Sequence, residues 1–120
     1  MKASSRRPEQ VAEALRGVIA ETLVREVRDP RVGLVTVTHV EVTQDLSVAR
    51  VRVAVPGDDE QKRLGLEGLR SAAGFLRSRA ARTLATRTVP ELRFELDRGI
   101  EHAQRIGEIL EGLRREGEID

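Results

Sequence analysis

The sequence Ser71-Ala72-Ala73-Gly74-Phe75-Leu76-Arg77-Ser78 places small residues and a glycine inside an apolar helical pattern, which then resumes among closely spaced arginines. A glycine in a helix interior costs roughly 1 kcal/mol relative to alanine, so it indicates a bend or a close approach by another backbone. Helical spacing continues on both sides of it, at Leu66, Leu69, Ala73, Leu76, Ala80 and Leu84. The stretch predicts two helical pieces bent at Ala72-Ala73-Gly74 that share one buried face, with close helix packing at Gly74 alone as the alternative.

The chain before this stretch predicts one helix and two strands. The helix is expected to begin at Pro8 and to end near Val27, because Asp29-Pro30 disfavours helical geometry. The segment 34–43 is rich in β-branched residues, and Ala49–Val55 alternates with period two. Because the connection between the two strands is short, they are predicted to form an antiparallel hairpin.

The chain after it predicts a third strand. An aspartate at position 58 or 59 is expected to cap the start of the kinked helix pair. Leu92, Phe94 and Leu96 alternate with charged residues as a strand, and Pro90 near its start favours a sheet edge or a strand entry.

A final amphipathic helix is expected over about 99–115, with residues 116–120 frayed. Its apolar positions are spaced to pack back on the domain: Ile100, Ala103, Ile106, Leu110 and Leu113. The order of elements is helix, strand, strand, kinked helix pair, strand, helix. We therefore predict an α+β fold in a single domain over residues 1–120, with its core at about 7–98.

The formal net charge of +1 hides a separation of charge along the chain. Between residues 61 and 88 the one acid is Glu67, against the bases Lys62, Arg63, Arg70, Arg77, Arg79, Arg82 and Arg87. Arg6 and Arg7, with Lys2, form a second basic cluster, whereas acids dominate from Glu101 onward. The basic regions are candidates for holding phosphate groups; solvated helix faces and a frayed terminus are the alternatives.

The residue inventory argues against several function classes. Two phenylalanines, with no tryptophan or tyrosine, leave no apparent base-stacking platform, and the lack of cysteine excludes disulfides and thiolate metal sites. His39 and His102 fall in separate elements without ligand spacing, and Asp45 is interpreted as a turn residue, so we expect no enzyme activity, metal or cofactor. No signal peptide or membrane span is evident, and a cytoplasmic protein is expected.

Several motifs, in order, resemble one known family. They are Asp29-Pro30-Arg31 with Gly33, Val40-Glu41-Val42 with Asp45-Leu46, Ala49-Arg50-Val51-Arg52-Val53, Ala72-Ala73-Gly74-Phe75-Leu76-Arg77 and Val89-Pro90-Glu91-Leu92-Arg93-Phe94. Each motif is weak evidence alone. Their ordered combination resembles the ribosome-binding factor A family, and the resemblance spans residues 7 to about 106. The order of elements resembles a type II K-homology domain.

The resemblance implies a ribosome maturation factor that acts by binding. It would bind free or immature small (30S) ribosomal subunits as a monomer, and assist late folding and 5′-end processing of 16S rRNA. Other assembly factors or GTPases are further candidate partners. An Ala-x-Gly bend, matched by Ala72-Ala73-Gly74, replaces the Gly-x-x-Gly loop with which ordinary K-homology domains clamp single strands. A general single-stranded RNA-binding module and a protein-interaction domain built on the acidic final helix are the alternatives.

The predicted RNA-binding residues are Arg6, Arg7, Arg70, Ala72, Ala73, Gly74, Arg77, Arg79, Arg82 and Arg87. Phosphate oxygens are expected to approach backbone amides at the start of the second helical piece, while guanidinium groups add bidentate contacts. Changing Arg77, Arg79 and Arg82 to glutamate is expected to weaken subunit binding while thermal stability stays near normal.

Overall fold

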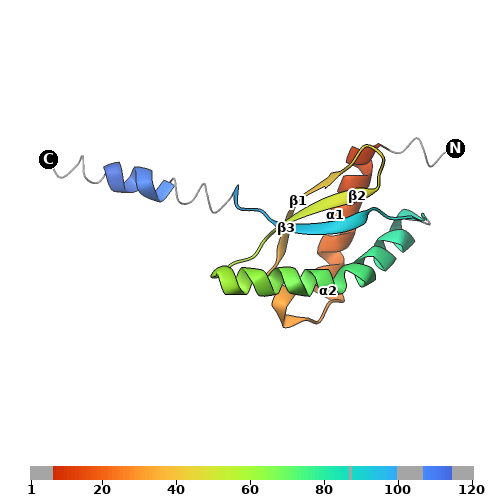
Figure 1. The fold of residues 1–120 in the computed structure, drawn as a ribbon, viewed down its shortest axis with the longest axis horizontal. Helices are drawn as coiled ribbons and strands as arrows, with labels where there is room; N and C mark the ends of the chain where they lie inside the picture. Colours follow the sequence, from red (N-terminus) through yellow and green to blue (C-terminus); the bar gives the residue numbers. More distant parts are fainter. Residues whose placement is uncertain (1–6, 87, 100–106, 115–120) are drawn as a thin grey trace.

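The computed structural model describes residues 7–86, 88–99 and 107–114. Its elements are α1 (Pro8–Arg25), the 3-10 turn η2 (Pro30–Val32), β1 (Thr36–Val42), β2 (Val48–Ala54), α2 (Asp59–Leu84) and β3 (Glu91–Leu96) (Figure 1). Residues 107–114 are also helical. The predicted α+β class and the order helix, strand, strand, helix, strand are confirmed, and this order fits a K-homology-like fold.

The three strands form one sheet in the order β1-β2-β3. β1 pairs antiparallel with β2, from Thr36 opposite Ala54 to Val42 opposite Ala49, which confirms the predicted hairpin. β2 and β3 run parallel, a pairing that is possible because α2 carries the chain across the sheet between them. β3 therefore lies at one edge, as predicted, and β1 forms the other edge.

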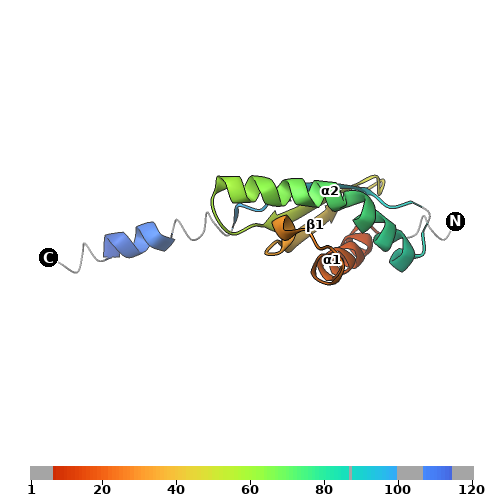
Figure 2. The same ribbon diagram turned by 90° about the horizontal axis from the view of Figure 1, so that it is seen from below.

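Both helices cover the same face of the sheet. α1 packs against β1, α2 packs against β3, and the two helices contact each other (Figures 1 and 2). The period-two pattern of β2 buries Ala49, Val51 and Val53 completely in this layer, while Arg50 and Arg52 lie on the opposite, open face. The alternation of side chains along β2 thus specifies which face is covered.

The core between sheet and helices is aliphatic. Leu15 and Ile19 of α1 and Leu69 and Leu76 of α2 are fully buried. Removing such a side chain from water stabilises the fold by roughly 1.5–3 kcal/mol. These buried faces, more than intrinsic helix propensity, hold α1 and α2 on the sheet.

α2 is one uninterrupted helix of 26 residues, so the predicted break into two helical pieces at Ala72-Ala73-Gly74 is wrong. The predicted bend itself is present, because Figure 1 shows that α2 changes direction partway along its length although the helix continues. Gly74 is not among the residues with positive φ, so its backbone adopts a conformation that alanine also adopts. The aspartate cap is confirmed at Asp58, whose side chain accepts a hydrogen bond from the Gln61 amide at 2.8 Å.

Close packing occurs at two other glycines of α2. A β-carbon added at Gly65 would lie 3.0 Å from Cγ1 of Val55, and one at Gly68 would lie 2.8 Å from Cγ1 of Val32. At Gly74, such a carbon would meet no atom of another element within 4 Å in the described part of the chain, so the alternative of close packing there is wrong. The close approach of α2 to η2 and to the end of β2 therefore lies in its N-terminal half.

The first helix ends close to its predicted end, whereas the last helix differs from expectation. α1 ends at Arg25, with Glu26 as its C-cap, within two residues of the predicted end near Val27. In the segment 107–114, Ile109, Leu110 and Leu113 are 57%, 61% and 58% exposed, so the prediction that the last helix packs back on the domain is wrong for this segment. The other residues of that prediction lie outside the described ranges: Ile100, Ala103, Ile106 and 116–120.

Candidate nucleic-acid interface

One long face of α2 is exposed, and most of its length carries only positive charge. Arg70, Gly74 and Ser78 follow at four-residue spacing, which places them along one side of the helix, and all three are exposed. α2 has acidic residues at 59, 60 and 67 but none from Gly68 to Leu84, where four arginines lie. We call this surface the basic α2 face and define it by Arg70, Ser71, Gly74, Arg77, Ser78 and Arg82.

Two of its arginines have no partner among the residues that the structure describes. Arg70 and Arg82 are exposed, and neither side chain forms an ion pair or hydrogen bond with any residue in the described ranges. A guanidinium keeps its charge at every relevant pH, and its planar fork of donors matches the geometry of phosphate. These two side chains are therefore available for phosphate oxygens.

Arg77 and Arg79, also predicted to bind RNA, make contacts within the protein. The Arg77 guanidinium donates to the carbonyl oxygen of Val89 at 3.1 Å, which ties α2 to the entry of β3. Arg79 forms an ion pair with Glu26 across 2.6 Å and lies 4.9 Å from the ring centroid of Phe75. Glutamate at position 79 would oppose a second carboxylate, so we now expect the triple substitution that includes both arginines to lower thermal stability.

The three residues of the predicted bend have different surroundings. Ala72 and Ala73 are half-buried against the core, whereas Gly74 is exposed. Because α2 continues through this position, no second helix N-terminus with unsatisfied amides exists there. The predicted approach of phosphate to such amides is therefore wrong. Gly74 instead leaves an open position with no side chain on the basic α2 face.

Two bases from the region 61–88 do not belong to this face. Lys62 is 8% exposed, and its ammonium donates to two carbonyl oxygens of the connection between β2 and α2, each at 2.7 Å. Arg63 is exposed but is paired with Glu60 and Glu67 on the adjacent turns. The positive charge of α2 that is available to a ligand thus lies on the basic α2 face, at Arg70 and Arg82.

The second predicted basic cluster is described only at Arg7, which is exposed and is the N-cap of α1. The first turns of α1 lie beside the end of α2, because Gln10, Val11, Ala14 and Leu84 line one small hollow. Arg7 therefore lies at the same end of the helical layer as the C-terminus of α2. Arg6 and Arg87 lie outside the described residues.

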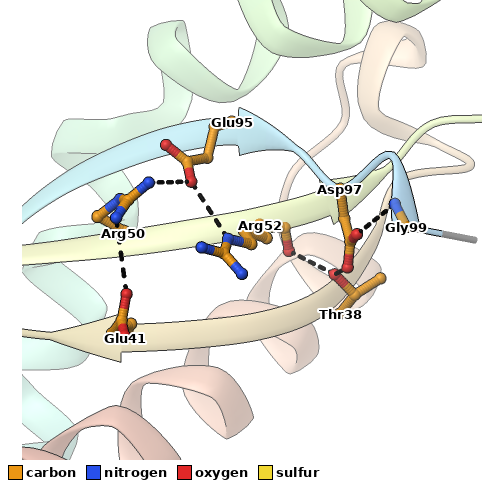
Figure 3. A network of polar contacts seen from close by, with 7 residues as sticks. All are labelled: Thr38, Glu41, Arg50, Arg52, Glu95, Asp97 and Gly99. Atoms are coloured by element: carbon orange, nitrogen blue, oxygen red, sulfur yellow. Dashed lines mark hydrogen bonds and ion pairs between the residues drawn. The ribbon is translucent and has the colours of Figure 1, made fainter.

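The open face of the sheet is charged but largely neutralised by internal pairs (Figure 3). Arg50 on β2 lies 2.9 Å from a carboxylate oxygen of Glu95 on β3 and 3.7 Å from one of Glu41 on β1. Arg52 lies 3.2 Å from the same Glu95 oxygen. The hydrogen bond from Arg50, joined by that from Arg52, lowers the pKa of Glu95. These pairs favour a role for Arg50 and Arg52 in solvating the sheet surface over direct contact with RNA.

A further set of hydrogen bonds on this face joins the segment after β3 to β1. The Thr38 hydroxyl donates to one carboxylate oxygen of Asp97 at 2.6 Å, and the Gly99 amide donates to the other at 2.9 Å (Figure 3). Both hydrogen bonds lower the pKa of Asp97, and the one from Thr38 has the larger effect. This carboxylate thus links β1 to the segment beyond β3, across β2.

Asp45 is confirmed as a turn residue. Its carboxylate accepts hydrogen bonds from the Ser47 amide, the Ser47 hydroxyl and the Thr43 hydroxyl. The hydrogen bonds from the Ser47 and Thr43 side chains are the main causes of a lowered pKa at Asp45. His39 is exposed on β1, and His102 lies outside the described residues. In the part of the chain that the structure covers, no three His, Cys, Asp or Glu side chains are grouped to hold a metal ion. No helix within the same ranges is long and apolar enough to cross a membrane.

Sequence comparison finds likeness along nearly the whole chain. The family described as Ribosome-binding factor A matches residues 7–110. A protein of that name from Rhodopirellula baltica is 52% identical over 115 residues, covering 96% of this chain and 84% of the relative. Another from Thermomicrobium roseum is 45% identical over 116 residues, covering 97% and 90%.

Solved structures of similar proteins share the fold. The crystal structure of ribosome-binding factor A from Thermus thermophilus matches with a TM-score of 0.65 at 28% identity, covering 76% of this chain and 97% of that one. A homology model of the Thermus thermophilus factor, fitted into a cryo-electron microscopy map of its complex with 30S, matches with a TM-score of 0.57 at 32% identity, covering 77% and 92%. From the family match, the long alignments and the shared fold, we conclude that this chain belongs to the ribosome-binding factor A family.

Proposed function

We propose that this protein is a ribosome maturation factor that binds free or immature small ribosomal subunits and assists late folding and 5′-end processing of 16S rRNA. Family membership supports the proposal, as does the fitted complex of the Thermus thermophilus relative with 30S. In this chain, the observation that carries it is the basic α2 face, where Arg70 and Arg82 project without partners among the described side chains.

The basic α2 face suits the sugar-phosphate backbone of a folded RNA. Arg70 and Arg82 are twelve residues apart in α2, so their attachment points are separated by about 18 Å at the helical rise of 1.5 Å per residue. Between them, Gly74 and Ser78 present little side chain, which allows a phosphate backbone to lie close to the helix. Phosphate contacts position an RNA without reading its sequence, so recognition would come from the shape of the folded target.

We further propose that the protein acts by binding alone, as a monomer in the cytoplasm. Catalysis needs acids, bases or a metal that converge on one site. Asp29, Asp45, Asp58, Glu95 and Asp97 are each engaged in an ion pair, a helix cap, a turn or a hydrogen bond across the sheet. These roles support a binding factor rather than a nuclease.

A general single-stranded RNA-binding module is the second candidate, favoured by the exposure of Phe75. The Phe75 ring lies next to Gly74 and is 41% exposed, which the helical pattern did not indicate. Exposed aromatic rings can stack on unpaired bases. However, the Arg79 guanidinium already covers one ring face. A single half-covered ring gives little platform for a run of bases, so the structured target is favoured.

The test is co-sedimentation with purified small subunits. The variant Arg70→Glu with Arg82→Glu should bind at least about tenfold more weakly, because two phosphate contacts become repulsive. The matched control is Arg25→Glu with Arg93→Glu, which makes the same change in net charge at exposed positions away from the basic α2 face. This control should bind within about twofold of the unmodified protein.

Two results would contradict the proposal. Equal loss of binding in both double variants would show that net charge, and not the basic α2 face, drives association. Equal affinity of the unmodified protein for small subunits and for an unstructured oligonucleotide would favour the single-strand module. A logarithmic salt slope of about −1.4 to −1.8 is expected from the two arginines alone, at roughly −0.7 to −0.9 per phosphate neutralised.

A further inference from the structure

A groove runs between α1 and the free edge of the sheet. β1 is an edge strand, and α1 packs beside it (Figure 1). The groove has a volume of about 440 Å³, and it is lined by residues 38–42 of β1 and by one stripe of α1 formed by Pro8, Glu9, Ala12, Glu13 and Arg16. A helix beside an edge strand is an arrangement into which an extended peptide can add as a further strand.

The strand edge offers backbone groups for such pairing. In an antiparallel ladder, alternate residues direct their N–H and C=O groups to the partner strand. The Thr43 amide donates to the Val48 carbonyl at 3.0 Å, so the same alternation directs the backbone of Glu41 to β2 and that of Val40 and Val42 to the open edge. Within the described ranges, no backbone hydrogen bond outside the ladder involves Val40 or Val42.

The usable edge is short. The register between β1 and β2 shifts between Val37 and His39, and regular pairing continues from His39 to Val42. Such a bulge limits indiscriminate edge-to-edge association of sheets. An added strand would therefore pair over about four residues, and side-chain contacts in the groove would have to supply the rest of its affinity.

Charge indicates what kind of segment the groove would accept. Glu9, Glu13 and Glu41 are exposed along it, and Arg16 is the one arginine or lysine in its lining. Arg16 is occupied by Glu13 at 3.0 Å, and Glu41 is 3.7 Å from Arg50, whereas Glu9 has no ion pair within the described ranges. The groove thus has a negative balance that repels a phosphate backbone and attracts lysine and arginine.

We propose that this groove binds an extended, lysine- and arginine-rich segment of another protein, which adds as a fourth strand beside β1. Main-chain hydrogen bonds to Val40 and Val42 hold the segment, and the acids around the groove select its basic side chains. Pro8 and Ala12 are half-buried and short, so they leave room for its apolar side chains. This contact uses a different surface from the basic α2 face, so the protein can engage RNA and a basic segment together.

Amide hydrogen exchange measured by NMR on the full chain tests the proposal. The probe is a nine-residue peptide that alternates lysine and valine, and the same peptide with glutamate in place of lysine is the control. The lysine peptide should slow exchange of the Val40 and Val42 amides as it saturates the protein, and the glutamate peptide should not. Failure of the lysine peptide to bind, or protection at the β3 edge instead, would overturn the proposal.

Charge reversal separates the groove from general attraction between opposite charges. Glu9→Lys with Glu41→Lys should weaken binding of the lysine peptide about tenfold, while Glu21→Lys with Glu91→Lys should weaken it by no more than about twofold. Equal weakening in the two pairs would overturn the proposal. If circular dichroism showed that the Glu9 and Glu41 double variant does not fold, the proposal would be tested by protection of the Val40 and Val42 amides in the unmodified chain. Binding to small subunits should persist in the first pair, which keeps this test independent of the RNA-binding proposal.

Discussion

Replacing Gly74 with alanine should stabilise the protein, although the same change at Gly68 in the same helix should destabilise it. Gly74 has a helical backbone, and a β-carbon there meets no atom of another element within 4 Å in the described part of the chain. Alanine is therefore accommodated without strain, and it lowers the conformational entropy of the unfolded chain. The gain expected for an exposed helix interior is about 0.5–1 kcal/mol, or roughly 2–4 °C in melting temperature for a domain of this size.

At Gly68 the same gain in helix propensity is outweighed by overpacking. The new β-carbon would lie 2.8 Å from Cγ1 of Val32 and 3.1 Å from Cβ of Arg31. Val32 is buried, and its short, stiff side chain cannot swing away, so α2 or η2 must shift. Overpacking of a core typically costs about 1–3 kcal/mol, which outweighs the gain in helix propensity and leaves a net loss of up to about 2.5 kcal/mol.

Urea unfolding followed by circular dichroism would measure both changes, and the shift in transition midpoint at constant slope gives the difference in unfolding free energy. Opposite signs for Gly74→Ala and Gly68→Ala are the expected result. A loss of stability in Gly74→Ala would refute the reasoning, because it would mean that the bend of α2 requires glycine at this position. A gain of stability in Gly68→Ala would refute the close contact between α2 and η2.

Three further predictions test the sheet, the loop before α2 and the core. Thr38→Val removes the hydrogen bond that most lowers the pKa of Asp97, so that pKa should rise toward its ordinary value. Because a depressed carboxyl pKa stabilises the fold above the unfolded-state pKa and this contribution is lost as pH falls through the folded-state pKa, the variant should be less stable at neutral pH. It should also lose less stability on acidification below about pH 4; an unchanged carboxyl titration by NMR would contradict the contact. Lys62→Met should lower the unfolding free energy by about 1–3 kcal/mol, since two loop carbonyls lose their donor, and an unchanged urea midpoint would show that another donor replaces it. Leu76→Ala should cost about 2–5 kcal/mol at a fully buried site, whereas Leu113→Ala should change stability by less than about 0.5 kcal/mol; similar costs in thermal unfolding would mean that Leu113 packs against the domain after all.

Features that depend on neighbouring residues could be predicted from the sequence. Asp58 caps α2 through an amide three residues away, and Asp45 shapes its turn through side chains within two residues. The alternation along β2 identifies its buried face because side chains in a strand point to opposite sides in turn. These interactions are local, so the residue types and their spacing already contain the information.

The functional surface could be predicted only in outline. The sequence indicated that positive charge gathers between residues 61 and 88, but not which bases remain available. Lys62, Arg77 and Arg79 are bound to groups of the protein itself, whereas Arg70 and Arg82 project from α2. The partners of the two bound arginines are Val89, just before β3, and Glu26, just after α1, and their positions follow from how α1 and β3 pack around α2.

The sequence by itself therefore determined the order of helices and strands, the buried face of the sheet and membership of the family. The tertiary structure decided that Gly65 and Gly68, and not Gly74, lie in close packing, and which arginines project from α2. It also decided that residues 107–114 expose their apolar side chains. The physical reason is that a periodic pattern records which side of an element is apolar, while contact, burial and ion pairing depend on the residues that folding brings against that side from elsewhere in the chain.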